Sequence, residues 1–195
     1  YIELSIIVSK YRNKYINDIN YYLNDIFEFI TGINGLGIIY VSNLNFTNDF
    51  NENMLKKKIN DSFNREIQYK TTLFGPNRDD YIFILNGKNL SLFGSQGQIR
   101  SAVLALKLAE VKLFYNITKE EPILLLDDIF SELDIKKRNN VLRYLNNNIQ
   151  TIITTTDINN IDRNIRKRAN VYNIENGKII SREIILKQEG DIDEK

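Results

Sequence analysis

Two carboxylates stand directly after a run of apolar residues. Residues 123–126 read Ile-Leu-Leu-Leu, and Asp127 and Asp128 follow them. A buried strand would hold both carboxylates rigidly at its carboxyl end, the edge at which ligands bind in open α/β sheets. There one carboxylate can hold Mg²⁺ and the other can position and deprotonate an attacking water. A helix cap or a solvated turn is the structural alternative for the same pattern.

A second segment has the composition of a phosphate contact at the start of a helix. In Ser95-Gln96-Gly97-Gln98 the serine can cap the helix and still offer its hydroxyl, and Gly97 lets the backbone approach a ligand. A helix N-terminus also supplies free N–H groups and the positive end of the helix dipole. An ordinary N-capped helix is the alternative. Residues 131–134 and 154–156 likewise have structural interpretations, as a helix-start cap and as β-branched residues that end a strand.

Composition narrows the chemistry that this chain can perform. Its 195 residues include no Cys and no His, which excludes thiolate nucleophiles, zinc fingers and Ser-His catalytic pairs. The net charge of +1 excludes a histone-like basic protein but leaves room for basic patches. Residues 56–58 and the group Arg163, Arg166, Lys167 and Arg168 are candidates for contact with DNA phosphates, although charge runs are more often solvated faces. No apolar run approaches the length of a membrane helix, and we expect a cytoplasmic protein.

The first part of the chain predicts a helix, a strand and a second helix. A stripe of apolar residues at helical spacing ends before a C-terminal glycine, Gly32. Residues 37–41 are typical of a strand, and a second apolar stripe follows the possible caps Asn48 and Asn51. The first stripe consists of Tyr11, Tyr15, Ile19, Leu23, Ile26 and Ile30, and the second of Leu55, Ile59 and Phe63.

The remainder predicts alternating strands and helices, hence an α/β layer structure. We expect a hairpin of residues 81–85 and 89–92 around Asn86-Gly87, and a buried helix over 99–114. After it we expect a central strand at 123–126 and a helix over 135–148 that buries Val141, Leu142 and Leu145. A buried strand at 151–155 and a hairpin of 171–174 and 179–180 should follow, with disorder beyond 187.

The order and spacing of these segments resemble the C-terminal half of an ABC-type ATPase head. Residues 95–98 resemble the signature motif, and residues 123–128 resemble Walker B. Residues 131–134 resemble the D-loop, and residues 154–156 lie where the switch loop would be. Within that superfamily, residues 93–100, 104–110 and 75–80 are similar to the RecF family of bacterial recombination mediators. Asn77 stands where that family has His in a Gly-Pro-His-Arg-Asp-Asp stretch. Asp128, where transporters and SMC proteins carry Glu, agrees with RecF rather than with an SMC head.

The resemblance implies a fold, cofactors and partners. The fold is the C-terminal half of an ABC-ATPase head, a layered sheet with helices (residues 73–186), preceded by a helical arm (1–72) and followed by a disordered tail (187–195). The implied cofactors are ATP and Mg²⁺, with Asp127 as the metal ligand and Asp128 as the catalytic residue. The implied partners are DNA at single-strand/double-strand junctions, RecR, RecO, RecA and a second copy in an ATP-dependent homodimer, with no membrane. The residues expected to contact the nucleotide are Ser95, Gln96, Gly97, Gln98, Asp134 and Thr155.

None of the nine glycines begins a G-x-x-x-x-G-K-[ST] phosphate loop. In the family that loop lies in the N-terminal half. We therefore expect this chain to be the C-terminal portion of a longer protein, and to be inactive as an ATPase by itself. Two alternatives remain open: an SMC-like or other ABC-type ATPase head, and a non-catalytic interaction module in which Asp127, Asp128 and Ser95 are only caps.

Overall fold

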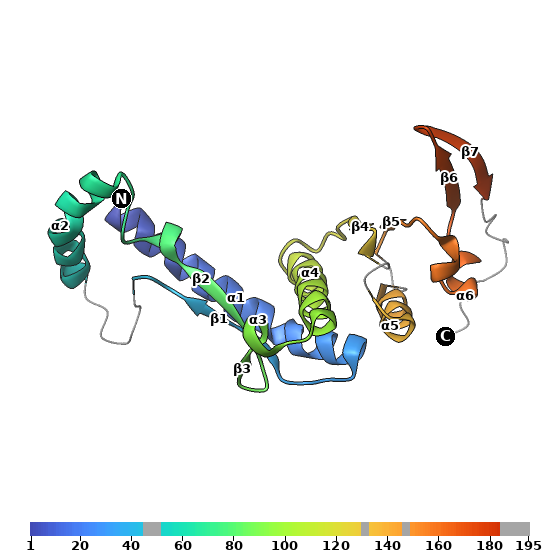
Figure 1. The fold of residues 1–195 in the computed structure, drawn as a ribbon, viewed down its shortest axis with the longest axis horizontal. Helices are drawn as coiled ribbons and strands as arrows, with labels where there is room; N and C mark the ends of the chain where they lie inside the picture. Colours follow the sequence, from blue (N-terminus) through green and yellow to red (C-terminus); the bar gives the residue numbers. More distant parts are fainter. Residues whose placement is uncertain (45–51, 130–132, 146–148, 184–195) are drawn as a thin grey trace. The chain divides into compact units, whose positions relative to one another are not determined.

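The computed structural model describes residues 1–44, 52–129, 133–145 and 149–183, which form two compact units. The first unit is Tyr1–Leu124 and the second is Leu125–Lys195. Both helices and strands are present, as Figure 1 shows, and the predicted α/β class is confirmed. In the described part of the chain, no helix is both long enough and apolar enough to cross a membrane.

The first unit is built on α1 (Ile2–Thr31), which packs against α4 (Gln96–Thr118) and β1 (Leu36–Val41). The helix ends as predicted, because Gly32 adopts a left-handed conformation (φ 74°) and donates its N–H to the Glu28 carbonyl at 2.7 Å. The buried stripe begins later than predicted: Tyr11 is 71% exposed and Tyr15 41%. It consists instead of Ile16, Ile19, Leu23, Ile26, Phe27 and Ile30, with Ile6 buried nearer the start of the helix.

A three-stranded antiparallel sheet joins segments that the sequence assigned to different domains. Its order is β1, β2 (Asp80–Leu85), β3 (Lys88–Asn89), and Leu36 pairs with Leu85 while Val41 pairs with Asp80. The predicted boundary between residues 72 and 73 lies between two strands of one sheet, and the chain divides into its two compact units between Leu124 and Leu125.

The hairpin turn at Asn86-Gly87 forms as predicted, with both residues at positive φ (50° and 77°). Its second strand is shorter than expected. Asn89 accepts a hydrogen bond from the Ser91 N–H at 2.9 Å, which caps the short helix α3 (Leu90–Phe93) and ends the strand. The 3₁₀ turn η1 (Pro76–Arg78) precedes β2, and α2 (Glu52–Tyr69) follows β1. The predicted caps Asn48 and Asn51 lie outside the described residues.

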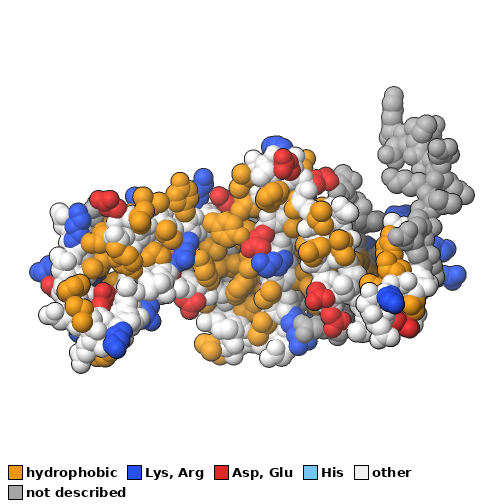
Figure 2. Space-filling model, turned by 90° about the horizontal axis from the view of Figure 1, so that it is seen from above, with side chains coloured by type: hydrophobic (Ala, Val, Ile, Leu, Met, Phe, Trp, Pro, Cys, Tyr) orange, Lys and Arg blue, Asp and Glu red, His pale blue; other side chains and the backbone are white. Residues whose placement is uncertain are grey.

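The helix α4 is buried along one side rather than all round. Apolar residues on one side pack inward, but Val103 is 48% exposed and Phe114 43%, so the prediction of a buried helix over 99–114 is wrong for the other side. The buried apolar residues are Ala102, Leu104, Ala105, Leu108, Ala109 and Leu113. Other large apolar side chains of the unit, such as Leu4, Ile7 and Ile39, are also exposed. Hydrophobic atoms cover broad areas of the face drawn in Figure 2.

The second unit contains the helix α5 (Ile135–Leu145) and a two-stranded sheet of β4 (Leu124–Asp127), whose first residue ends the first unit, and β5 (Thr151–Thr154). The helix buries Val141, Leu142 and Leu145, as predicted. Both strands were expected to be buried, and this is wrong for one face of the sheet within the described residues. Leu125 is 68% exposed and Ile152 51%, and burial alternates along both strands, so one face of this sheet is uncovered among the described residues.

The unit continues through η3 (Ile158–Asn160) and the short helix α6 (Arg163–Arg166) to a hairpin of β6 (Val171–Glu175) and β7 (Lys178–Glu183). The turn of this hairpin, Asn176-Gly177, has the positive φ values that its sequence predicts (49° and 74°). The predicted tail at 187–195 and the predicted end of the helix at 146–148 lie outside the described residues.

Candidate functional site

One hydroxyl joins the carboxylate-bearing end of β4, Asp127 and the following Asp128, to the end of β5. Thr154 Oγ1 donates a hydrogen bond to Asp127 Oδ1 and accepts one from the backbone N–H of Asp128 at 3.1 Å. Asp128 has a left-handed backbone (φ 45°), a conformation that Asp adopts more readily than most residues and that turns the chain away from the strand. Both aspartates are exposed. The arrangement presents two carboxylates to solvent at a strand end, and such oxygens fit a hard cation such as Mg²⁺.

Thr154 is the functional candidate that the sequence analysis missed within the triple threonine. The hydroxyl of Thr155, the predicted nucleotide contact, donates to the Asp157 carbonyl at 3.1 Å and accepts from the Asp157 N–H at 3.3 Å. It therefore stabilises a local turn. The alternation of side chains along a strand could have distinguished Thr154 from Thr155, because neighbouring residues of a strand point to opposite faces. Nucleotide contact by Thr155 stays a prediction.

The segment from Ser95 to Gln98 forms a capping box at the start of α4. Ser95 Oγ accepts from the Gln98 N–H at 3.2 Å, and the Gln98 side chain accepts from the Ser95 N–H at 2.8 Å. Gln96 and Gly97 lie in the first turn, where the Gly97 carbonyl accepts from Ser101 Oγ at 2.7 Å. A hydroxyl that accepts one hydrogen bond can still donate its own proton. Capping and a phosphate contact are therefore compatible at Ser95.

Asp134 caps the start of α5. Its carboxylate accepts from the Lys137 N–H at 2.9 Å and forms an ion pair with Lys137 Nζ at 2.9 Å. The hydrogen bond from the Lys137 side chain, followed by that from its backbone, lowers the pKa of Asp134. The side chain is still 56% exposed. Ser131 and Glu132 of the predicted D-loop lie outside the described residues.

The structure thus brings Asp127, Asp128 and Thr154 together in the second unit, whereas Ser95 to Gln98 belong to the first. Nowhere in residues 1–44, 52–129, 133–145 and 149–183 do three or more acidic side chains gather as a ready-made metal cage. A magnesium ion here would be held by Asp127, with its other ligands from water and phosphate, as is usual for Mg²⁺.

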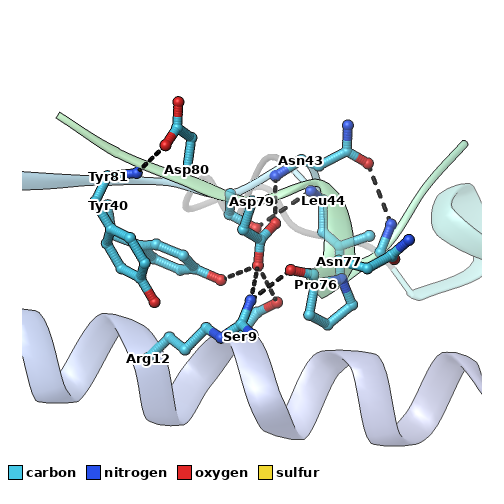
Figure 3. Close-up of polar contacts among 12 residues, drawn as sticks. Ser9, Arg12, Tyr40, Asn43, Leu44, Pro76, Asn77, Asp79, Asp80 and Tyr81 are labelled. Atoms are coloured by element: carbon cyan, nitrogen blue, oxygen red, sulfur yellow. Dashed lines mark hydrogen bonds and ion pairs between the residues drawn. The ribbon is translucent and has the colours of Figure 1, made fainter.

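A third polar group, centred on Asp79, was not predicted from the sequence (Figure 3). The Asp79 side chain is completely buried. Its Oδ2 accepts from Ser9 Oγ (3.3 Å), from Arg12 Nη1 (3.3 Å) and from the Tyr40 hydroxyl. Its Oδ1 accepts from the Asn43 N–H at 2.8 Å. The carboxylate therefore connects α1 with the end of β1 and with the loop before β2.

This buried carboxylate fixes the Gly-Pro-Asn-Arg-Asp-Asp loop. Arg12 also donates to the Pro76 carbonyl, and Gly75 occupies a backbone conformation (φ 123°) that L side chains rarely adopt. Arg78 is exposed and donates to the Thr72 carbonyl and to Thr71 Oγ1, both at 2.8 Å. The similarity of residues 75–80 to the RecF family drew attention to this loop. No local sequence pattern marks its hydrogen-bond partners on α1 and β1.

Comparisons with known proteins support the resemblance. No family model matches the chain. The DNA replication and repair protein RecF of Lactobacillus acidophilus is 42% identical over 174 residues, which are 86% of this chain and 46% of that protein. RecF of Clostridium botulinum (strain Eklund 17B / Type B) is 41% identical over 181 residues, 92% of this chain and 50% of that protein. The chain spans about half the length of the curated relatives it matches.

Solved structures agree. A structure described as the recombination mediator protein RecF-ATPrS in the RecFOR pathway superposes with a TM-score of 0.70 at 28% identity, covering 90% of this chain and 46% of that one. A RecF-ATP structure of the same pathway gives 0.67 at 31% identity, over 80% of this chain and 43% of that one. The resemblance to the RecF family predicted from the sequence is confirmed over most of this chain.

Proposed function

We propose that this chain is the C-terminal portion of a RecF-like, ATP-dependent DNA-binding protein of recombinational repair and replication restart. The observation that carries the proposal is the link between Asp127, Asp128 and the Thr154 hydroxyl, in a chain 42% and 41% identical to two RecF proteins. Two accessible carboxylates, oriented by a neighbouring strand, are what nucleotide hydrolysis needs at this position.

In this proposal different residues of the chain have different roles in ATP binding and hydrolysis. Asp127 holds Mg²⁺, which neutralises charge on the phosphates, and Thr154 orients its carboxylate by donating to Oδ1. Asp128 orients and deprotonates the attacking water. Ser95 to Gln98, Asp134 and Thr155 contact nucleotide, with Ser95 reaching the nucleotide held by a second copy. The support is indirect: the RecF structures that this chain resembles are described with ATP and ATPrS.

The proposed DNA substrate is a gap, with its single-strand/double-strand junctions. ATP binding closes a homodimer on the DNA and hydrolysis releases it, and the protein works with RecR and RecO to load RecA. Support for this part comes from the family resemblance and from the RecFOR pathway named for the similar structures. The proposed compartment is the cytoplasm, where a bacterial chromosome lies.

The test of the ATP role compares Asp128→Asn with Asp127→Asn in the complete RecF-like protein. Asp128→Asn keeps shape and hydrogen bonding but removes the base, so Mg²⁺–ATP should still bind while turnover falls by roughly 10²–10⁴-fold. Asp127→Asn should instead weaken Mg²⁺–ATP binding, because a neutral amide is a poorer ligand for a hard cation. Calorimetry and single-turnover hydrolysis measure the two effects.

Asp61→Asn is the matched control, since Asp61 is an exposed carboxylate on α2. It should leave both affinity and turnover unchanged. Normal hydrolysis in Asp128→Asn, or an equal loss of binding in Asp127→Asn and Asp128→Asn, would contradict the division of roles and leave the pair as a structural cap.

A non-catalytic interaction module is the second candidate, and the capping geometry favours it. Ser95 and Asp134 both satisfy backbone N–H groups at helix starts, which explains their residue types without any ligand. Ser95→Arg in the complete protein distinguishes the two functions. Under the ATPase proposal it abolishes ATP-driven dimerisation, measured by light scattering, and leaves nucleotide binding by the monomer nearly intact.

Under the module hypothesis, ATP changes the dimerisation of neither the wild type nor Ser95→Arg. The variant then loses only its helix cap, about 0.5–2 kcal/mol of stability. Ser95→Thr keeps a capping hydroxyl and serves as the control for helix stability.

A further inference from the structure

We infer that a cleft between α5 and the segment 162–168 binds phosphate groups. The cleft has a volume of about 430 Å³ and lies within the second unit. One wall is the face of α5 that carries Lys136, Asn139, Asn140 and Arg143, residues spaced three and four apart so that they share one side of the helix. The other wall holds Asp162, Asn164 and Arg168.

The lining is cationic and rich in amides. Lys136, Arg143 and Arg168 oppose one carboxylate, Asp162, and that carboxylate accepts a hydrogen bond from the Asn164 N–H at 2.8 Å. The ion pairs between described residues include none of the three cations. The excess positive charge of the cleft is therefore not neutralised by an ion pair within the described chain.

Arg143 is held in position for a ligand. Its Nη2 donates to Asn140 Oδ1, and the Asn140 side chain belongs to a residue only 7% exposed. This hydrogen bond restrains the guanidinium at the cleft wall, so less conformational entropy is lost when a ligand binds. A planar guanidinium with further N–H donors matches two oxygens of a phosphate group. Neighbouring amide side chains such as Asn139 can donate to a third oxygen.

The volume and the lining favour the phosphates of a nucleic-acid backbone. A cleft of about 430 Å³ is large enough for a phosphate with its sugar, and none of the lining residues is aromatic, so no base would stack there. Free polyphosphate has the same phosphate chemistry, so the test must distinguish its binding from the binding of a nucleic-acid backbone. Of the four basic residues at 163–168 considered in the sequence analysis, only Arg168 lines the cleft. The inference rests on the proposed function, for which it names a DNA-contacting surface.

The experiment uses the 195-residue chain and two probes, pyrophosphate and a short thymidine oligonucleotide. NMR follows the side-chain Nε–H signals of Arg143 and Arg168, and fluorescence anisotropy follows oligonucleotide binding as salt is varied. Both probes should shift both signals. Arg143→Gln combined with Arg168→Gln should lower the salt dependence, d log K/d log[salt], by about 1.4 for a single strand. Arg143→Lys should keep the salt dependence, because the positive charge remains. It should lower the oligonucleotide affinity several-fold, because the planar guanidinium that can bind two phosphate oxygens is lost.

Lys167→Gln is the control, since Lys167 is exposed, adjacent to Arg168 and outside the cleft lining. It removes one positive charge, half of what the double variant removes, and should leave the Arg143 shifts unchanged. Pyrophosphate binding at the cleft without oligonucleotide binding would support the site and contradict its DNA role. Oligonucleotide binding that the double variant retains in full would overturn the inference and leave the proposed function standing. Absence of any shift at Arg143 and Arg168 with both probes would also overturn the inference.

Discussion

Replacing Asp79 with Asn should destabilise the first unit strongly. The buried carboxylate accepts four hydrogen bonds, from Ser9, Arg12, Tyr40 and the Asn43 N–H. The amide oxygen of Asn can replace only one carboxylate oxygen, and the amide NH₂ would face donors instead of accepting from them.

The size of the effect follows from burial and charge. Removing one partner of a buried ion pair costs about 3–5 kcal/mol, and leaving a buried donor unsatisfied costs about 1–3 kcal/mol. Arg12 is 37% exposed, so its charge can turn partly to water, which lowers the cost. We expect a loss of about 2–4 kcal/mol, equivalent to roughly 30- to 700-fold in the opening equilibrium.

Hydrogen exchange is the suitable assay, because a chain of two compact units need not unfold in one transition. Peptides from β1 and β2 should lose protection by the expected factor in Asp79→Asn. The control is Asp80→Asn, since the exposed Asp80 carboxylate accepts a hydrogen bond from the adjacent Tyr81 N–H at 2.8 Å. Protection in Asp79→Asn within threefold of the wild type would refute the reasoning that this carboxylate holds α1, β1 and the loop together.

Two further changes test single contacts. Burial, then the hydrogen bond to Asp79, raises the pKa of Tyr40 above its ordinary 10.0. The folded chain therefore keeps a proton that the unfolded chain loses, so the stability of the first unit should fall as pH rises from 10.0 toward the folded pKa, and Tyr40→Phe should flatten that decline in urea titrations. Thr154→Val removes the hydroxyl that joins Asp127 and Asp128 to β5, and should cost about 0.5–1.5 kcal/mol in thermal unfolding. Thr154→Ser keeps the hydroxyl and should retain most of that stability, and an equal loss in both variants would contradict the stabilising role of the hydroxyl.

Periodicity and turn chemistry predicted most elements of the fold. Both Asn-Gly hairpins form, because these residues tolerate the positive φ that such turns require. The end of α1 at Gly32 follows from the same local preference. Local patterns failed where burial depends on distant neighbours. Tyr11 has helical spacing but no described residue covers it, so it is 71% exposed, and Leu125 belongs to an apolar run but is 68% exposed.

The candidate site was predictable only in part, for a related reason. The Asp127-Asp128 pair is visible in the sequence, but the hydroxyl that orients it comes from Thr154, 27 residues away from Asp127. The capping box from Ser95 to Gln98 is visible as well, since both of its members lie within one turn. The group around Asp79 was invisible, because its partners on α1 and β1 are separated from it by up to 70 residues.

The chain contains the dipeptide Asp-Asp at both 79–80 and 127–128, and physical context gives the two pairs different roles. Asp79 is completely buried and accepts four hydrogen bonds, one of them from a guanidinium. A cation could reach it only by displacing these donors, so Asp79 is structural. Asp127 and Asp128 are exposed at a strand end, where the one hydroxyl of Thr154 both donates to Asp127 Oδ1 and accepts from the Asp128 N–H. Such carboxylates can exchange water for a metal ion at little cost. Solvent access therefore favours Asp127 and Asp128 over Asp79 as the carboxylates for the ATP chemistry that we propose.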